Sequence, residues 1–118
     1  HVRMGKMEAA GIVEKNTLKV NYAKLGFDIT AFIGIYLEKS ALYDSVLARL
    51  KDIQEVTNIH YTTGNYSMFV RIHCRDTNHL KEVLHDKIQQ VEGIERTETM
   101  ISLEESLDRN LALTSLGI

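Results

Sequence analysis

The sequence contains no proline, no tryptophan and a single cysteine, Cys74, among its 118 residues. One cysteine cannot form an intramolecular disulfide and fits a reducing compartment, so we expect a cytoplasmic protein. The longest apolar run, residues 29–37, is interrupted by Thr30 and Gly34 and is too short to span a bilayer. We also expect no secretory signal peptide and no membrane partner.

The sequence also lacks a concentration of positive charge. Its formal net charge is −2, and the only basic bias lies at the start of the chain, at Arg3 and Lys6. Nucleic-acid binding needs clustered lysine and arginine, because neutralising phosphates dominates the affinity. The composition therefore argues against a nucleic-acid-binding surface over most of the chain.

What the chain does have is an ordinary globular composition, with 44% hydrophobic and 25% charged residues. A chain of this length buries one core and has little room for a large internal pocket. We therefore expect one main domain. Any small-molecule site is expected at an edge, in a loop or between copies of the chain.

Hydrophobic periodicity predicts two strand–helix–strand units. The predicted elements are strands over residues 29–37, 56–61, 68–74 and 97–104, one helix capped by Ser40, and a second helix capped by Asp76 or Thr77. The apolar stripes of the two helices are Leu42, Val46, Leu50 and Ile53, and Leu80, Leu84, Ile88 and Val91.

Two split βαβ units of this kind close into a four-stranded antiparallel sheet with both helices on one face. The predicted fold class is therefore α+β, a ferredoxin-like βαββαβ sandwich. In such a sheet we expect the last strand beside the first and the third. The preceding segments are less regular: residues 1–10 have helical spacing that ends at Gly11, and residues 12–22 alternate loosely like a short strand.

The sheet face away from the helices carries more apolar surface than a monomer needs. The residues expected on this outer face are Phe32, Tyr36, Phe69, Arg71, His73, Glu98 and Met100. We expect the domain to form a homodimer through this face, with twofold symmetry as the simplest form. The alternative is that the apolar tail, residues 106–118, folds back over the same face.

The residues that carry chemistry do not predict a catalytic or metal site. Cys74 falls on the apolar face of its strand, so we expect a buried, inert thiol. The histidines lack metal-ligand spacing, because His73 and Cys74 point in opposite directions and His79 and His85 do not share a helix face. We therefore expect no enzyme activity, no metal and no cofactor.

The connection between the strands at residues 56–61 and 68–74 is unusually polar. It carries four hydroxyl groups and one amide around a single glycine, in Thr62, Thr63, Gly64, Asn65, Tyr66 and Ser67. A plain polar turn is one interpretation. The other is a pocket for a zwitterionic amino acid, whose carboxylate needs hydrogen-bond donors and whose ammonium needs oxygen acceptors. Gly64 permits close backbone approach, and residues 96–99 of the last strand offer an acidic partner from a neighbouring chain.

Four stretches resemble the Lrp/AsnC family of bacterial and archaeal regulators. "HVRMGKMEAAGIV" resembles the end of the recognition helix and the following turn of the family's helix-turn-helix domain, whereas "KLGFDITAFIGIYLE", "YTTGNYSMFVRIHC" and "TETMISLEES" resemble its ligand-sensing domain. The resemblance implies a βαββαβ sensing domain, dimers that assemble into octamers, an amino-acid effector and transcriptional regulation without catalysis. It divides the chain into residues 1–15, the tail of the DNA-binding domain with its linker, and residues 16–118, the amino-acid-sensing and oligomerisation domain.

The resemblance also implies which residues bind the effector. They are His60, Tyr61, Thr62, Thr63, Gly64, Asn65, Tyr66 and Ser67 of the loop, Thr97 and Glu98 of the last strand at an interface, and His79 and Val83 of the second helix near the loop. Many family members have aspartate where this chain has Ser67, so Glu98 or backbone carbonyls must accept the effector's ammonium group. AsnC-like members share the serine, which favours asparagine as the effector.

Arg3 and Lys6 are what the chain retains of a DNA-contacting surface, so we expect specific DNA binding only through upstream helices. Two alternatives come from other functional classes. One is a standalone binding module that hetero-oligomerises with full-length regulators. The other is a small dimeric ferredoxin-like enzyme with a pocket between the sheet and the helices.

Overall fold

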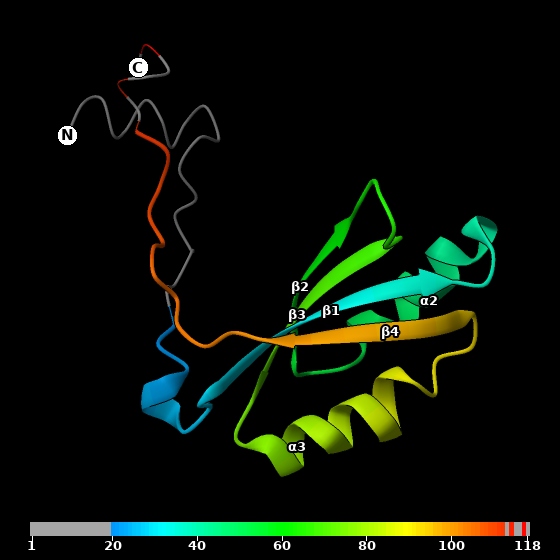
Figure 1. Cartoon of the computed structure of the whole chain (residues 1–118), viewed down its shortest axis with the longest axis horizontal. Helices are drawn as coiled ribbons and strands as arrows, with labels where there is room; N and C mark the ends of the chain where they lie inside the picture. Colours follow the sequence, from blue (N-terminus) through cyan, green and yellow to red (C-terminus); the bar gives the residue numbers. More distant parts are fainter. Residues whose placement is uncertain (1–19, 113, 115–116, 118) are drawn as a thin grey trace.

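The computed structural model describes residues 20–112, 114 and 117 (Figure 1). The helix expected over residues 1–10, together with Arg3 and Lys6, lies outside the described residues, as does most of the strand expected over residues 12–22. For residues 20–22, which the structure describes, the strand prediction is wrong, because these residues form no strand. A short 3-10 helix, η1 (Ala23–Leu25), follows them.

The remaining elements follow the predicted order of two strand–helix–strand units. They are β1 (Ile29–Leu37), the 3-10 turn η2 (Ser40–Leu42), α2 (Tyr43–Lys51), β2 (Val56–Tyr61), β3 (Met68–Cys74), α3 (Thr77–Glu82), the π-helical turn η3 (Val83–Ile88) and β4 (Ile94–Ile101). The last strand begins earlier than predicted and ends at Ile101. Within the described ranges, no helix is long and apolar enough to cross a bilayer.

The four strands form one antiparallel sheet in the order β2-β3-β1-β4. This arrangement confirms the ferredoxin-like fold. The expectation that the last strand lies beside both the first and the third is wrong, because β3 and β4 occupy opposite edges of β1. In the register, Gly34 at the centre of β1 lies opposite Phe69 on β3 and Glu98 on β4.

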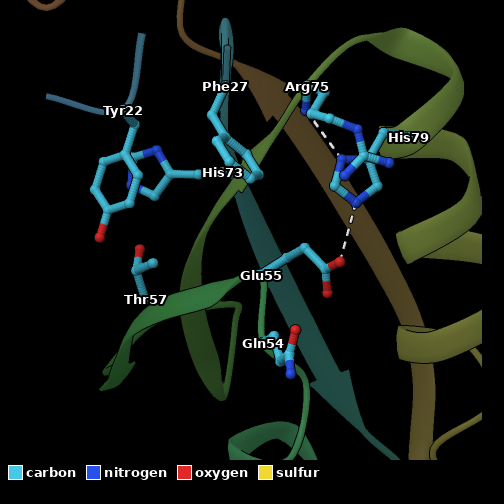
Figure 2. Close-up of a pocket in the computed structure, with 8 residues that line it drawn as sticks. All are labelled: Tyr22, Phe27, Gln54, Glu55, Thr57, His73, Arg75 and His79. Atoms are coloured by element: carbon cyan, nitrogen blue, oxygen red, sulfur yellow. Dashed lines mark hydrogen bonds and ion pairs between the residues drawn. The ribbon is translucent and has the colours of Figure 1, made fainter. Parts of the chain in front are cut away.

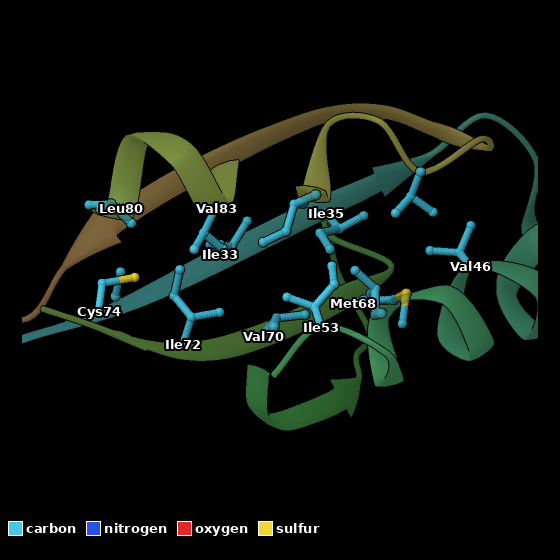
Figure 3. Close-up of a cluster of buried hydrophobic side chains, with 14 residues drawn as sticks. Ile33, Ile35, Val46, Ile53, Met68, Val70, Ile72, Cys74, Leu80 and Val83 are labelled. Atoms are coloured by element: carbon cyan, nitrogen blue, oxygen red, sulfur yellow. The ribbon is translucent and has the colours of Figure 1, made fainter. Parts of the chain in front are cut away.

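The hydrophobic core lies between the sheet and the two helices (Figure 3). Alternate residues of β1 and β3 point into it and are fully buried: Ala31, Ile33, Ile35, Met68, Val70, Ile72 and Cys74. On the second helix Leu84 is only partly buried, and Val83 is fully buried instead. The cause is η3, because a π-helical turn contains more residues than an α-helical turn and shifts the 3.6-residue stripe.

Of the two predicted helix N-caps, one is confirmed and one is wrong. Asp76 caps α3, and its Oδ1 accepts a hydrogen bond of 2.8 Å from the backbone N–H of His79. Ser40 does not cap the first helix. It is the first residue of η2, and neither η2 nor α2 has a side-chain cap bond.

The described part of the C-terminal tail runs away from the sheet (Figure 1). Leu103 is 98% exposed, and Leu107 and Leu111 are also exposed. The alternative in which the tail covers the outer face is therefore wrong for residues 106–112. On that face the rings of Phe32 and Phe69 stack with centroids 5.7 Å apart, and Met100 is exposed. Dimerisation through this face stays a prediction.

Candidate functional site

The loop between β2 and β3 is held to the sheet by its own backbone. The N–H of Thr62 donates to the carbonyl of Ser67 at 3.2 Å, and the N–H of Ser67 donates to the carbonyl of Ile35 on β1 at 2.9 Å. The Thr62 hydroxyl donates to the carbonyl of Tyr66 at 2.8 Å. Gly64 makes the turn with a φ of 95°, in the left-handed region that favours glycine.

Three polar side chains of this loop remain available to a ligand. Thr63 and Asn65 are exposed, and Ser67 is half-buried. Across the described residues, none of these three side chains has a hydrogen-bond partner within the chain. Among these polar residues, Thr62 is the one whose side chain stabilises the turn itself. The side chains of Thr63, Asn65 and Ser67 are not needed for the turn and can bind a ligand.

Tyr66 extends from the loop across the outer face of the sheet. Its ring lies directly over Gly34, where an added Cβ would approach Tyr66 Cγ to 2.8 Å. The Tyr66 hydroxyl donates to Oε2 of Glu98 at 2.8 Å, and the Tyr36 hydroxyl donates to Oε1 of the same carboxylate at 3.1 Å. The loop and the last strand therefore meet within one chain. We call the loop together with Tyr36, Arg96 and Glu98 the loop cluster.

Glu98 is the anionic centre of the loop cluster. Hydrogen bonds from Tyr66 and then Tyr36 hold the pKa of its carboxyl below the ordinary value. The same bond to Glu98 raises the pKa of Tyr66, and partial desolvation followed by the Glu98 bond raises the pKa of Tyr36. The Arg96 guanidinium lies 4.0 Å from the centroid of the Tyr36 ring. At neutral pH the cluster therefore presents a carboxylate between two neutral phenols.

The other expected effector residues at this end of the sheet are placed differently. His60 and Tyr61 are exposed at the end of β2, where the ring of Tyr61 stacks on Tyr43 at 4.2 Å. Thr97 lies opposite Ile35, a core residue, so its side chain leaves the sheet on the face opposite to Glu98. Only Glu98 of this pair joins the loop cluster in one chain.

His79 and Val83 do not approach the loop within one chain. The loop precedes Met68 and α3 follows Cys74, so the whole of β3, about 20 Å, separates the loop from the start of α3. His79 is buried there, and Val83 belongs to the hydrophobic core. The expectation that His79 lies near the loop is therefore wrong for a single chain.

Sequence reasoning missed Tyr36 and Gly34 as parts of the site. Tyr36 was expected only on the outer face, and Gly34 only as an interruption of an apolar run. A glycine inside a strand of β-branched residues is a signal for close approach by another group. Here that group is the ring of Tyr66.

The cysteine and the potential metal ligands can be located in the part of the chain that the structure describes. Cys74 is buried as predicted, and burial raises the pKa of its thiol to about 11, so the thiol is protonated at neutral pH. No three histidine, cysteine or acidic side chains among the described residues are placed to hold a metal ion.

The sequence comparisons identify relatives along nearly the whole chain. The model of the Lrp/AsnC ligand binding domain matches residues 30–112. Regulatory protein AsnC of Escherichia coli strain K12 is 42% identical over 111 residues, which are 94% of this chain and 73% of that protein. HTH-type transcriptional regulator FL11 of Pyrococcus furiosus is 36% identical over 104 residues, which are 88% of this chain and 68% of that protein.

The structural comparisons agree with the sequence comparisons. The structure of E. coli AsnC matches with a TM-score of 0.86 over 94% of this chain and 74% of that chain. The transcriptional regulator NMB0573 of Neisseria meningitidis, solved as a complex with L-Met, also has a TM-score of 0.86, over 98% of this chain and 76% of its own. That protein is 20% identical, so its likeness shows the shared fold alone.

Proposed function

Because the chain belongs to the Lrp/AsnC family of amino-acid-responsive transcriptional regulators, we propose that its loop cluster binds asparagine as the effector. The observation that carries this proposal is the set of unpaired side chains of Thr63, Asn65 and Ser67 beside an ionised carboxylate, Glu98. The complex of NMB0573 with L-Met supports a free amino acid as the class of ligand.

Each part of asparagine has a complementary group in the loop cluster. The hydroxyls of Thr63 and Ser67 donate to the effector's carboxylate. The side-chain amide of Asn65 pairs with the amide of the effector, which distinguishes asparagine from aspartate and from apolar amino acids. Glu98 accepts the ammonium group, because a carboxylate has about four acceptor positions and the two tyrosines use two of them.

The effector acts in this proposal by changing how copies of the chain assemble. The apolar outer face, with Phe32, Phe69 and Met100, supports a dimer, and four dimers form an octamer with effector sites at the seams. An effector shifts an assembly by its difference in affinity between two arrangements, and a tenfold difference corresponds to about 1.4 kcal/mol per site.

The domain division belongs to the same proposal. Residues 1–15 are the tail of a DNA-binding domain with its linker, and residues 16–118 are the sensing and oligomerisation domain. DNA is bound through helices upstream of Arg3 and Lys6, in the cytoplasm, and the chain has no catalytic role. The relatives' designations as regulatory proteins support this assignment.

Calorimetry with each of the twenty amino acids tests the effector proposal. We expect asparagine to bind most tightly, in the submillimolar range. Asn65→Ala should weaken asparagine binding by about tenfold, the loss expected when one hydrogen-bonding partner of the ligand is removed. The matched control is Asn110→Ala, which removes an exposed amide from the tail.

Two results would contradict the proposal. One is an intact assembly to which no amino acid binds below millimolar concentrations. The other is asparagine binding that is equally strong in the Asn65 and Asn110 variants. Sedimentation velocity on the same samples establishes whether the assembly is intact.

A further inference from the structure

A cavity lies at the far end of β3 from the loop cluster (Figure 2). Its volume is about 240 Å³, and it is formed by residues on either side of η1, the segment that leads into β2, the end of β3 and the start of α3. The lining residues are Tyr22, Phe27, Gln54, Glu55, Thr57, His73, Arg75 and His79. None of the loop residues contributes to it.

The acidic group of this cavity is already neutralised. Lys87 Nζ donates to Oε1 and Oε2 of Glu55 at 3.0 and 3.1 Å, and Nε2 of His79 lies 2.9 Å from Oε2. The backbone N–H of Arg75 donates to Nδ1 of His79, so Nε2 carries the proton and donates to Glu55. Burial opposes ionisation, but these donors hold the pKa of Glu55 below its ordinary value.

The basic group of the cavity is not neutralised. Within the described part of the chain, the Arg75 guanidinium has no ion-pair or hydrogen-bond partner. His73 adds no positive charge, because burial and then the charge of Arg71 lower its pKa. Lys87 does not line the cavity but balances the charge of Glu55, so Arg75 is the one charged lining residue whose side chain has no ion-pair or hydrogen-bond partner among the described residues.

The opposite wall of the cavity is aromatic. The ring of Tyr22 stacks on the ring of His73 with centroids 4.0 Å apart, and Phe27 meets Tyr22 edge-on at 6.4 Å (Figure 2). Nε2 of His73 is buried without a hydrogen-bond partner among the described residues. An aromatic corner beside an unpaired guanidinium suits a ligand with a flat apolar body and one carboxylate.

We propose that this cavity binds a small carboxylate with an apolar body, held by Arg75 and packed against Tyr22 and Phe27. Its volume lies below the range of about 300–1,000 Å³ that drug-sized ligands occupy, so the ligand is no larger than a single-ring acid. Within one chain, β3 separates this site from the loop cluster. An aromatic amino acid and a simple aromatic acid share this chemistry, and the ammonium group distinguishes them.

The test uses fluorinated phenylacetate with the whole chain, with fluorine NMR of the ligand and proton NMR of the protein. We expect saturable binding in the millimolar range or tighter in the fluorine spectra, and shifts in the ring resonances of His73 in the proton spectra. Arg75→Gln should weaken binding by about tenfold, because it removes a charge-assisted pair with the carboxylate. Arg49→Gln is the matched control, since Arg49 is exposed on α2 and does not line the cavity.

A second variant distinguishes lost ligand binding from disturbed folding in the Arg75 variant. Phe27→Leu keeps an apolar side chain but removes the aromatic edge, and it should weaken fluorinated phenylacetate more than acetate. Competition by fluorine-free phenylacetate and by L-phenylalanine then identifies the source: stronger competition by phenylalanine indicates an amino-acid site, and stronger competition by phenylacetate indicates a site for simple acids.

Three results would overturn the proposal. The first is an absence of saturable binding. The second is equal binding in the Arg75 and Arg49 variants. The third is a set of ligand-induced shifts confined to residues 62–67, which would place the ligand in the loop cluster.

Discussion

Replacing Gly34 with alanine tests the packing of the loop cluster directly. Gly34 is buried at the centre of β1, and its added Cβ would lie 2.8 Å from Cγ of Tyr66. Cδ1 and Cε1 of the same ring lie closer still, so the added methyl group meets the near side of the ring and not its far end. The side chain must rotate away, and its hydrogen bond to Glu98 is then lost.

Two opposing effects determine the size of the change. Overpacking by one methyl group costs about 1–3 kcal/mol, whereas alanine gains about 0.5–1 kcal/mol over glycine in a strand. Gly34→Ala should therefore reduce the free energy of unfolding by about 0.5–2 kcal/mol, as measured by urea denaturation.

Whether Gly34→Ala raises or lowers the free energy of unfolding depends on the presence of the Tyr66 ring. In a Tyr66→Ala background no ring opposes the methyl group, so Gly34→Ala should raise the free energy of unfolding by about 0.5–1 kcal/mol. A destabilisation of the same size in both backgrounds would show that Tyr66 is not the neighbour that makes glycine necessary at position 34.

Three further predictions concern other parts of the fold. Asp76→Ala should lower the free energy of unfolding by about 1 kcal/mol through loss of the α3 cap, whereas Asp52→Ala, which removes no cap bond, should change it little. The lowered pKa of Glu55 contributes stability above pH 4.5 that is lost as the pH falls through the pKa of the folded state. Glu55→Gln should therefore reduce the acid-induced fall in the free energy of unfolding, and an unchanged pH dependence would contradict this. Cys74 should resist a thiol reagent at neutral pH until urea unfolds the protein, and fast reaction of the folded chain would show that it is not buried.

The sheet was predictable from the sequence because its two faces differ so clearly. On β3, Met68, Val70, Ile72 and Cys74 alternate with polar or half-buried residues, and a strand with this pattern has one possible orientation. The helix details were less predictable. Ser40 is a good cap by residue type, but η2 begins at Ser40 itself, and the wide turn η3 moves Val83 into the core.

The site was predictable only as a set of residue types around one turn. The excess of hydroxyls in residues 62–67 pointed to a ligand, and the structure leaves Thr63, Asn65 and Ser67 unpaired there. The hydrogen bond between Tyr66 and Glu98 could not be predicted from the sequence, because it depends on the strand register that places Glu98 opposite Gly34. Periodicity specifies which face a residue occupies but not which residue of a distant strand it meets.

A backbone amide NMR titration with L-asparagine locates the effector site residue by residue. We expect the amides of Gly64, Asn65 and Ser67 to shift together and to saturate at the concentration found by calorimetry. The contradicting result is saturable asparagine binding in which these amides stay unmoved while resonances elsewhere in the domain respond.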